Sequence, residues 1–264
     1  MSFDNHQSSL GSWYGTWSLF RRESRRFLKV WLQTVWAPLI SALLYFAIFG
    51  GALGKRIGDT DGVSFLLFLV PGLAAMGMIQ HAYQNTSSSL IQMKYLGMLP
   101  ADLLALPITP LQMTLAFVAA AILRGSLVGG VILLVSRVFV DFGVAHPLLL
   151  LLATVVLTAI FALVGLLTGV WGSNYDEVAM VGNFILTPLI YLGGVFFSVS
   201  MLPDSWAMVA RLNPIFYLVD LFRYALIDVS QARPEVALVA VLGVLGALFA
   251  GTVRLLASGW RLKN

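Results

Sequence analysis

Six long apolar stretches limit the folds that this chain can adopt. Each is close to the length, about 20 residues, that lets a helix cross the hydrocarbon core of a bilayer. Backbone groups in lipid must be satisfied internally, which a helix of this length achieves within its own segment. We therefore predict an all-α membrane protein with six transmembrane helices in one domain covering residues 1–264. The predicted spans are residues 30–53, 63–83, 108–136, 147–171, 178–199 and 236–256.

The composition indicates that lipid solvates much of the chain. Hydrophobic residues make up 59% of the sequence and charged residues 11%, with a mean hydropathy of +0.89. Soluble domains carry about 25% charged residues. The first apolar stretch follows a polar segment of about 30 residues, and no small-residue cleavage site closes it. We expect this stretch to remain in the protein as an anchor.

The sequence carries no pattern typical of a catalytic, cofactor or metal site. It contains no cysteine, and its three histidines are scattered. Residues 50–56 superficially resemble a phosphate-binding loop, but Phe49 stands where that motif requires glycine and Arg56 where it requires serine or threonine. No acid pair or His–Glu pair lies deep within a predicted span. We therefore expect no catalytic residue, no bound cofactor and no metal in this chain.

Positive charge is concentrated at both ends of the chain. The two terminal segments carry Arg21, Arg22, Arg25, Arg26, Lys29, Arg254, Arg261 and Lys263. Lys and Arg are enriched on the cytoplasmic side, and the region before the first span usually dominates. Both termini are therefore expected in the cytoplasm, which an even number of spans allows. Four tryptophans would then lie near cytoplasmic span ends, where an aromatic belt is expected: Trp31, Trp36, Trp171 and Trp260.

Residues 12–29 combine aromatic and basic side chains at helical spacing. Trp17 belongs to the aromatic set, and the other faces carry Arg21, Arg22, Arg25 and Arg26. This pattern is typical of an amphipathic helix in the membrane interface, with rings toward the acyl chains and cations toward lipid phosphates. The alternative is a basic topology signal with incidental aromatic residues. We favour the interfacial helix because a topology signal does not need regularly spaced aromatics.

Polar residues within the predicted spans are few. Arg124 lies about 24 Å along its helix from Ile108, which predicts a position in the outer half of the membrane. It should face the bundle interior, either to contact an anionic ligand group or to pair with a carbonyl or an acid such as Asp220. A second set of polar residues is Gln80, His81, Gln84 and Asn85. These residues either line a polar entrance or form the solvated end of a helix, and we favour the helix end. Pairs of glycines permit close helix packing: Gly125 with Gly129, and Gly165 with Gly169.

The connection between the fifth and sixth predicted spans is long and partly apolar. Asn213 and Pro214 separate two short helical pieces, because Asn caps helices and Pro starts them. Asp220 and Arg223 are three residues apart in the second piece, close enough to pair. We predict that residues 200–228 form re-entrant helices that enter the membrane from outside and pack against protein. The alternative is a pair of helices resting on the outer surface.

Several short motifs follow one another in a distinctive order. They are Val-Pro-Gly at 70–72, Leu-Leu-Ala-Leu-Pro at 103–107, Ala-Ile-Leu-Arg-Gly at 121–125, Leu-Thr-Pro-Leu-Ile-Tyr-Leu-Gly-Gly-Val-Phe at 186–196, Leu-Asn-Pro at 212–214 and Asp-Leu-Phe-Arg-Tyr at 220–224. In this order and spacing the chain resembles the ABC-2 type permeases, the membrane subunits of export-class ABC transporters. The resemblance covers nearly the whole chain and is closest to the branch of nodulation-factor permeases.

The resemblance implies partners and site residues that composition does not show. It implies a homodimer in the bacterial inner membrane, with two copies of a separate ATPase subunit that binds ATP and Mg²⁺. Residues 86–107 would form the cytoplasmic coupling loop that docks on the ATPase through Gln92, Lys94, Tyr95, Asp102 and Leu103. The pathway or gate candidates are Arg124, Asn213, Pro214, Tyr217, Asp220 and Arg223. Relatives usually carry an Arg/Glu-rich docking stretch, so docking here would be more apolar or would rely on the N-terminal helix.

We therefore predict a non-catalytic permease subunit of an ATP-driven exporter. Its substrate would be amphipathic, lipid-linked or of polysaccharide type. One alternative is an ion- or proton-coupled carrier, although such carriers usually hold acids deep in the membrane. Another is a membrane-embedded lipid-modifying enzyme, which would need a cluster of acids or histidines at one membrane face.

Overall fold

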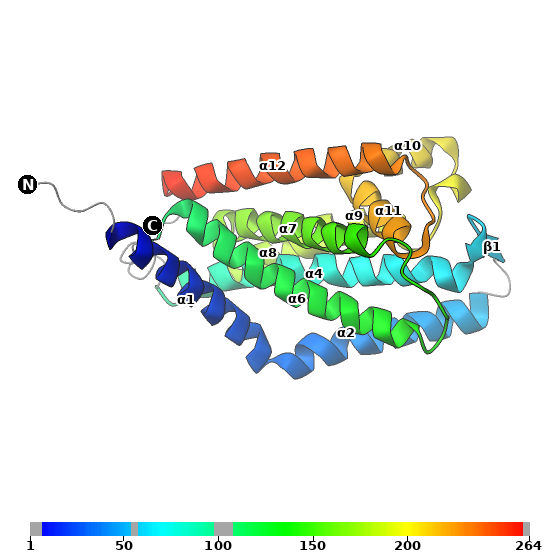
Figure 1. The fold of residues 1–264 in the computed structure, drawn as a ribbon, viewed down its shortest axis with the longest axis horizontal. Coiled ribbons are helices and arrows are strands. Elements are labelled where there is room, and N and C mark those ends of the chain that lie inside the picture. Colours follow the sequence, from blue (N-terminus) through cyan, green and yellow to red (C-terminus); the bar gives the residue numbers. More distant parts are fainter. Residues whose placement is uncertain (1–6, 54–57, 98–107, 261–264) are drawn as a thin grey trace, which may run out of the picture.

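The computed structural model describes residues 7–53, 58–97 and 108–260, and most of them are helical. The long helices run lengthwise through the molecule, and the ends of the described chain at residues 7 and 260 lie at the same end of it (Figure 1). The opposite end carries a small antiparallel hairpin of β1 (Asp59–Thr60) and β2 (Val63–Ser64). We call these the termini end and the hairpin end.

Five helices in the described part of the chain are long and apolar enough to cross a membrane. The first runs over Trp31–Gly50 and combines α2 (Trp31–Tyr45) with part of the π-helical η1 (Phe46–Leu53). The others are α4 (Phe65–Tyr95), α6 (Pro110–Ser136), α7 (Pro147–Trp171) and α12 (Pro234–Ser258). They correspond to the first, second, third, fourth and sixth of the predicted spans.

The fifth predicted span, residues 178–199, is not among these five. Three short helical segments follow one another there: α8 (Tyr175–Met180), η2 (Val181–Leu186) and α9 (Thr187–Leu192). η2 is a π-helical segment directly before Pro188, which has no N–H to continue the α-helical ladder. The helical part ends at Leu192 rather than at residue 199, because the chain turns at Gly194 with φ of +75°.

The second predicted span is longer than the sequence suggested. α4 continues to Tyr95, so the prediction that a loop begins at residue 86 is wrong. Consecutive hydroxyl residues lower the hydropathy of this segment, but Thr86, Ser87 and Ser89 are buried. The hydroxyls of Thr86, Ser87 and Ser88 donate to backbone carbonyls. Thr86 donates to the carbonyl of Ala162 on α7 at 2.8 Å, and Ser87 donates to its own helix. The rest of the predicted loop, residues 98–107, lies outside the described residues.

α4 lies at the centre of the bundle and packs mainly against α6 and α7. Glycines on these two helices make the close approach possible, as predicted. A Cβ on Gly125 of α6 would lie 2.6 Å from Thr158, and one on Gly169 of α7 would lie 2.9 Å from Leu90 of α4. A Cβ on Gly165 of α7 would meet the Tyr83 carbonyl and the Thr86 hydroxyl of α4. Helix packing in a membrane depends on such close contacts rather than on hydrophobic burial.

The remaining helices lie at the two ends. α1 (Gln7–Lys29) precedes α2 and packs against α6, so the predicted helix 12–29 is present and begins earlier. At the hairpin end, η3 (Val199–Met201), α10 (Asp204–Leu212) and α11 (Pro214–Ile227) follow the turn. The predicted break falls between α10 and α11, where the Asn213 side chain accepts from the Ile215 N–H at 3.0 Å.

Candidate functional site

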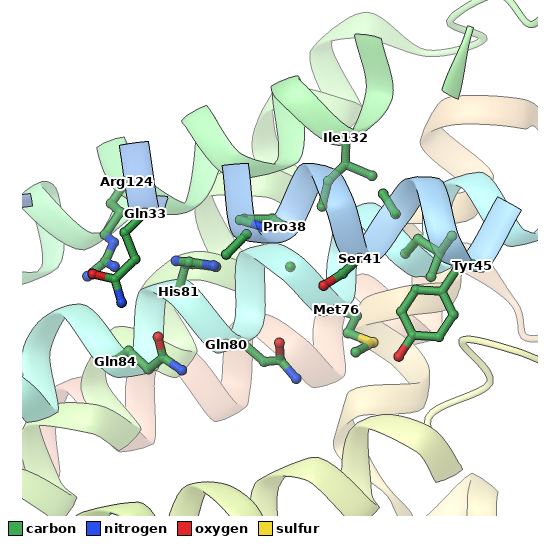
Figure 2. Close-up of a pocket in the computed structure, with 14 residues that line it drawn as sticks. Gln33, Pro38, Ser41, Tyr45, Met76, Gln80, His81, Gln84, Arg124 and Ile132 are labelled. Carbon is green, nitrogen blue, oxygen red and sulfur yellow. The ribbon is translucent and has the colours of Figure 1, made fainter. Parts of the chain in front are cut away.

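A cavity of about 330 Å³ lies between α2, α4 and α6. Figure 2 shows Gln33, His81, Gln84 and Arg124 toward one end of it, and Met76, Tyr45 and Ile132 toward the other. The polar end is level with the first turn of α2, because Gln33 lies two residues after Trp31. None of the described residues that line this cavity is acidic. The cavity is therefore amphipathic, with a cationic, amide-rich end toward the termini end.

One face of α4 supplies the polar lining. Gln80, Gln84 and Ser88 recur every four residues, so they lie above one another on the same face of the helix. Gln80 and Gln84 also line a second cavity of about 480 Å³ with α8 and η2, where Tyr175 and Asn183 contribute. The central helix thus carries a polar stripe with a cavity on each side of it.

The polar group around His81 is not a solvated helix end, so the interpretation that we favoured is wrong. α4 continues well beyond it to Tyr95, and Asn85 is fully buried. His81 lines the cavity, and its Nδ1 has no hydrogen-bond partner among the described residues. Asn85 therefore lies inside the bundle, Gln80 and His81 are half-buried along the cavity, and Gln84 is exposed. This mixture fits the alternative of a polar entrance.

Arg124 faces the bundle interior, as predicted. It lies beside Gln33 and close enough to Arg26 for their charges to interact. The next residue, Gly125, faces Thr158 and Met78, which lie near the middle of α7 and α4. Arg124 therefore lies about halfway along the long helices, and its position in the outer half of the membrane stays a prediction.

The guanidinium of Arg124 has no counter-charge in the described structure. Its Nε is buried without a hydrogen-bond partner, and no described carboxylate forms an ion pair with it. Asp220, the acid that the sequence offered as a partner, lies 3.8 Å from Arg223 instead. The pairing with Asp220 is therefore wrong.

α1 packs more deeply than an interfacial helix on a lipid surface. Its inner face carries Leu19, Glu23 and Phe27, each at most 3% exposed. Arg26 points inward as well: it binds Glu23 at 3.2 Å, Ser88 at 3.1 Å and the Asn85 carbonyl. Sequence reasoning missed Glu23, although its spacing of three residues from Arg26 is typical of a helical ion pair.

The outer faces of α1 carry exposed aromatic and basic side chains, as predicted. Trp17 is 61% exposed, and Arg21, Arg22 and Arg25 are exposed as well. Of the basic residues predicted to face lipid phosphates, Arg26 turns into the bundle, and Arg22 contacts Met93 of α4 at 3.3 Å while staying exposed.

A family model for the ABC-2 type transporter matches residues 14–227. The chain belongs to the ABC-2 type transporter family. The inner membrane transport permease YadH of Escherichia coli K12 is 40% identical over 234 residues, which cover 88% of this chain and 89% of that protein. Nodulation protein J of Rhizobium meliloti is 26% identical over 214 residues, 80% of each chain. Nodulation protein J of Rhizobium leguminosarum bv. viciae is 26% identical over 216 residues, 80% of this chain and 81% of that protein.

At the termini end of this ABC-2 protein, the proposed docking residues differ in role. Gln92 and Tyr95 are exposed at the end of α4, and the Tyr95 ring lies 5.8 Å from that of Tyr175. Lys94 donates to the carbonyls of Val170 and Gly172 at 2.6 and 2.7 Å, so it caps the end of α7. The two remaining docking candidates, Asp102 and Leu103, lie outside the described residues.

At the hairpin end, the ABC-2 motif residues Asp220 and Arg223 form a buried network. Arg223 is fully buried and donates to the Gly194 carbonyl at 2.6 Å. Asp220 accepts hydrogen bonds from the loop that precedes α12: from Ser230 Oγ at 2.8 Å and from two backbone N–H groups at 2.9 Å. The predicted pair is present, and its contacts tie α11 to the turn after α9 and to the loop before α12.

Three other gate candidates lie nearby, at the cap and in the first turn of α11. Asn213 donates to the Leu189 carbonyl at 2.6 Å besides capping α11, and Pro214 starts that helix. The Tyr217 ring contacts that of Phe216 at 5.2 Å between centroids. Arg124 lies about halfway along the long helices, in the cavity beside α2, so the structure does not bring the six pathway candidates together.

Proposed function

We propose that this chain is the permease subunit of an ATP-driven exporter in the bacterial inner membrane. It would act as a homodimer with two copies of a separate ATPase subunit, which binds ATP and Mg²⁺. The family match over residues 14–227 and the 40% identity to a protein named as an inner membrane transport permease support this role. The chain itself carries out no bond chemistry in this proposal.

The proposed topology has six crossings with both termini in the cytoplasm. The continuous segment of α8, η2 and α9 would supply the fifth crossing, and α10 and α11 would be re-entrant on the outer side. Two observations support this arrangement. Both ends of the described chain lie at one end of the bundle, where Trp171 and Trp260 are half-exposed at helix ends, and Trp31 is half-exposed at the start of α2. The buried Asp220–Arg223 network holds α11 against protein, which a re-entrant segment requires.

The polar stripe of α4 is the main support for the proposed substrate pathway. Gln80, Gln84 and Ser88 lie on one face of the central helix α4, with a cavity on either side. Polar side chains inside a membrane bundle are costly and usually mark a route for substrate or ions. The cavity beside α2 has one polar and one apolar end, which suits an amphipathic or lipid-linked substrate better than a purely hydrophilic one.

Co-expression with a candidate ABC ATPase subunit from the same organism tests the proposal. We expect a stable complex of two copies of each chain and ATP hydrolysis that depends on the permease. An ATPase variant without its phosphate-binding lysine is the control, since it should assemble but not hydrolyse ATP. Failure of the two chains to associate, or transport in vesicles that proceeds without nucleotide, would contradict the proposal and favour an ion-coupled carrier.

A further inference from the structure

The cavity between α2, α4 and α6 holds a positive charge that the described structure leaves unbalanced. Arginine stays protonated in proteins, so the guanidinium of Arg124 carries its charge here. The charge of another cation, Arg26, acts on it. The carboxylate of Glu23 is already engaged with Arg22 and Arg26. The Nε of the Arg124 guanidinium is buried without a hydrogen-bond partner among the described residues, so a bound anion would stabilise this site.

The hydrogen-bonding groups at the polar end suit an oxyanion. The Arg124 Nε and His81 Nδ1 are both buried and without partners among the described residues. The carboxamides of Gln33 and Gln84 line the same end of the cavity. Guanidinium and amide N–H groups are donors that recognise the oxygens of phosphate. No described lining residue is acidic, so nothing there would repel such a group.

The shape of the cavity limits what else the ligand can contain. From the polar end it extends along α2 past Pro38 to Tyr45, and Met76 and Ile132 line the far part. Tyr45 lies twelve residues after Gln33, which corresponds to about 18 Å along the helix. A volume of about 330 Å³ accommodates a headgroup and the first part of an acyl chain, but not an unmodified polysaccharide.

We propose that this cavity binds the phosphate headgroup of one anionic amphiphile, with Arg124 as its main contact. His81, Gln33 and Gln84 supply further hydrogen bonds, and the apolar chain lies against Met76 and Ile132. The headgroup lies level with the first turn of α2. The phosphate comes either from a resident phospholipid or from a transported lipid-linked phosphate, and only the second source depends on the proposed function.

Binding of radiolabelled dioleoyl phosphatidate to the purified full-length chain in dodecyl maltoside tests the site. We expect Arg124→Gln to weaken binding at least about tenfold and Arg124→Lys to weaken it less, because the charge remains. Arg25→Gln is the matched control, since Arg25 is exposed on α1 and lines no part of this cavity. Radiolabelled dioleoylglycerol, which has no phosphate, should bind weakly and equally to all four proteins.

The outcomes separate the possibilities. Equal phosphatidate binding by the wild type and Arg124→Gln, in proteins of the same melting temperature and elution volume, overturns the proposal. So does an equal loss in Arg25→Gln, which would indicate surface attraction alone. If Arg124→Gln does not fold, His81→Ala provides the same comparison. The assay contains no ATPase, so a negative result counts against this site and not against the proposed exporter role.

A second arm distinguishes the two sources of phosphate. The complex with the ATPase subunit is reconstituted with labelled phosphatidate already bound, and ATP is added. A label that leaves the protein during hydrolysis identifies the site as part of the transport route, whereas a label retained throughout identifies a resident lipid. Both results support the assigned headgroup site.

Discussion

The guanidinium of Arg223 lies 3.9 Å from the centroid of the Phe68 ring. Arg223 belongs to α11 and Phe68 to the first turn of α4, and both side chains are fully buried. A desolvated cation over an aromatic face is worth about 2 kcal/mol. With the bonds to Gly194 and the pairing with Asp220, this contact anchors the short helices of the hairpin end to the central helix.

Replacing Arg223 should therefore destabilise the hairpin end. We expect Arg223→Leu to cost about 3–5 kcal/mol, because it leaves the buried carboxylate of Asp220 without its counter-charge. Unfolding in SDS titrations measures the change. Arg211→Leu is the control, since Arg211 is exposed on α10, and it should have little effect. Equal stability of the two variants would show that the buried network does not hold α11.

Glu23 should decide whether α1 stays docked on the bundle. Glu23→Ala removes the carboxylate that pairs with Arg26, and we expect α1 to open away from α4 and α6. The chain has no native cysteine, so Leu19→Cys, at a position 3% exposed, reports on this opening. Maleimide labelling of that cysteine should become faster in the Glu23→Ala background.

Glu235→Ala is the control for this experiment, because Glu235 is an exposed acid at the start of α12. It should leave the labelling rate at Leu19→Cys unchanged. An unchanged rate in Glu23→Ala as well would mean that apolar packing alone holds α1.

Two glycine substitutions should have opposite effects. Gly165→Ala places a methyl group against the Tyr83 carbonyl and the Thr86 hydroxyl, so it should destabilise by about 1–3 kcal/mol. Gly243→Ala on α12 meets no atom within 4 Å, so the better helix propensity of alanine should leave stability equal or slightly higher. SDS unfolding of both variants provides the measurement, and similar effects would argue against close packing of α4 and α7.

Single cysteines test the proposed fifth crossing. Ser173→Cys lies between α7 and α8, and Asp204→Cys begins α10; both native residues are exposed. If α8, η2 and α9 cross the membrane, an impermeant maleimide added to whole cells labels Asp204→Cys and not Ser173→Cys. Asp59→Cys in the hairpin should react like Asp204→Cys. Labelling of both Ser173→Cys and Asp204→Cys from the same side would contradict a crossing by this segment.

The sequence by itself determined the helical membrane class, the family and several local features. Hydropathy locates five of the helices because a long apolar segment is helical in lipid whatever its neighbours are. The break at Asn213 and the pair of Asp220 with Arg223 also follow from the sequence. Caps and pairs three residues apart depend only on residues close in the chain.

Only the tertiary structure decided how far α4 extends, where Arg124 lies and that Glu23 is buried. The hydroxyls from Thr86 onward count as polar in a hydropathy sum. In the structure the first of them donates to the carbonyl of Ala162 on another helix as well as to that of Tyr83 on its own helix. The position of Arg124 relative to α2 depends on where α6 starts. Counting residues along α6 alone cannot give that relationship. Such features arise from contacts between distant segments, and these make the cavity cationic at one end and apolar at the other.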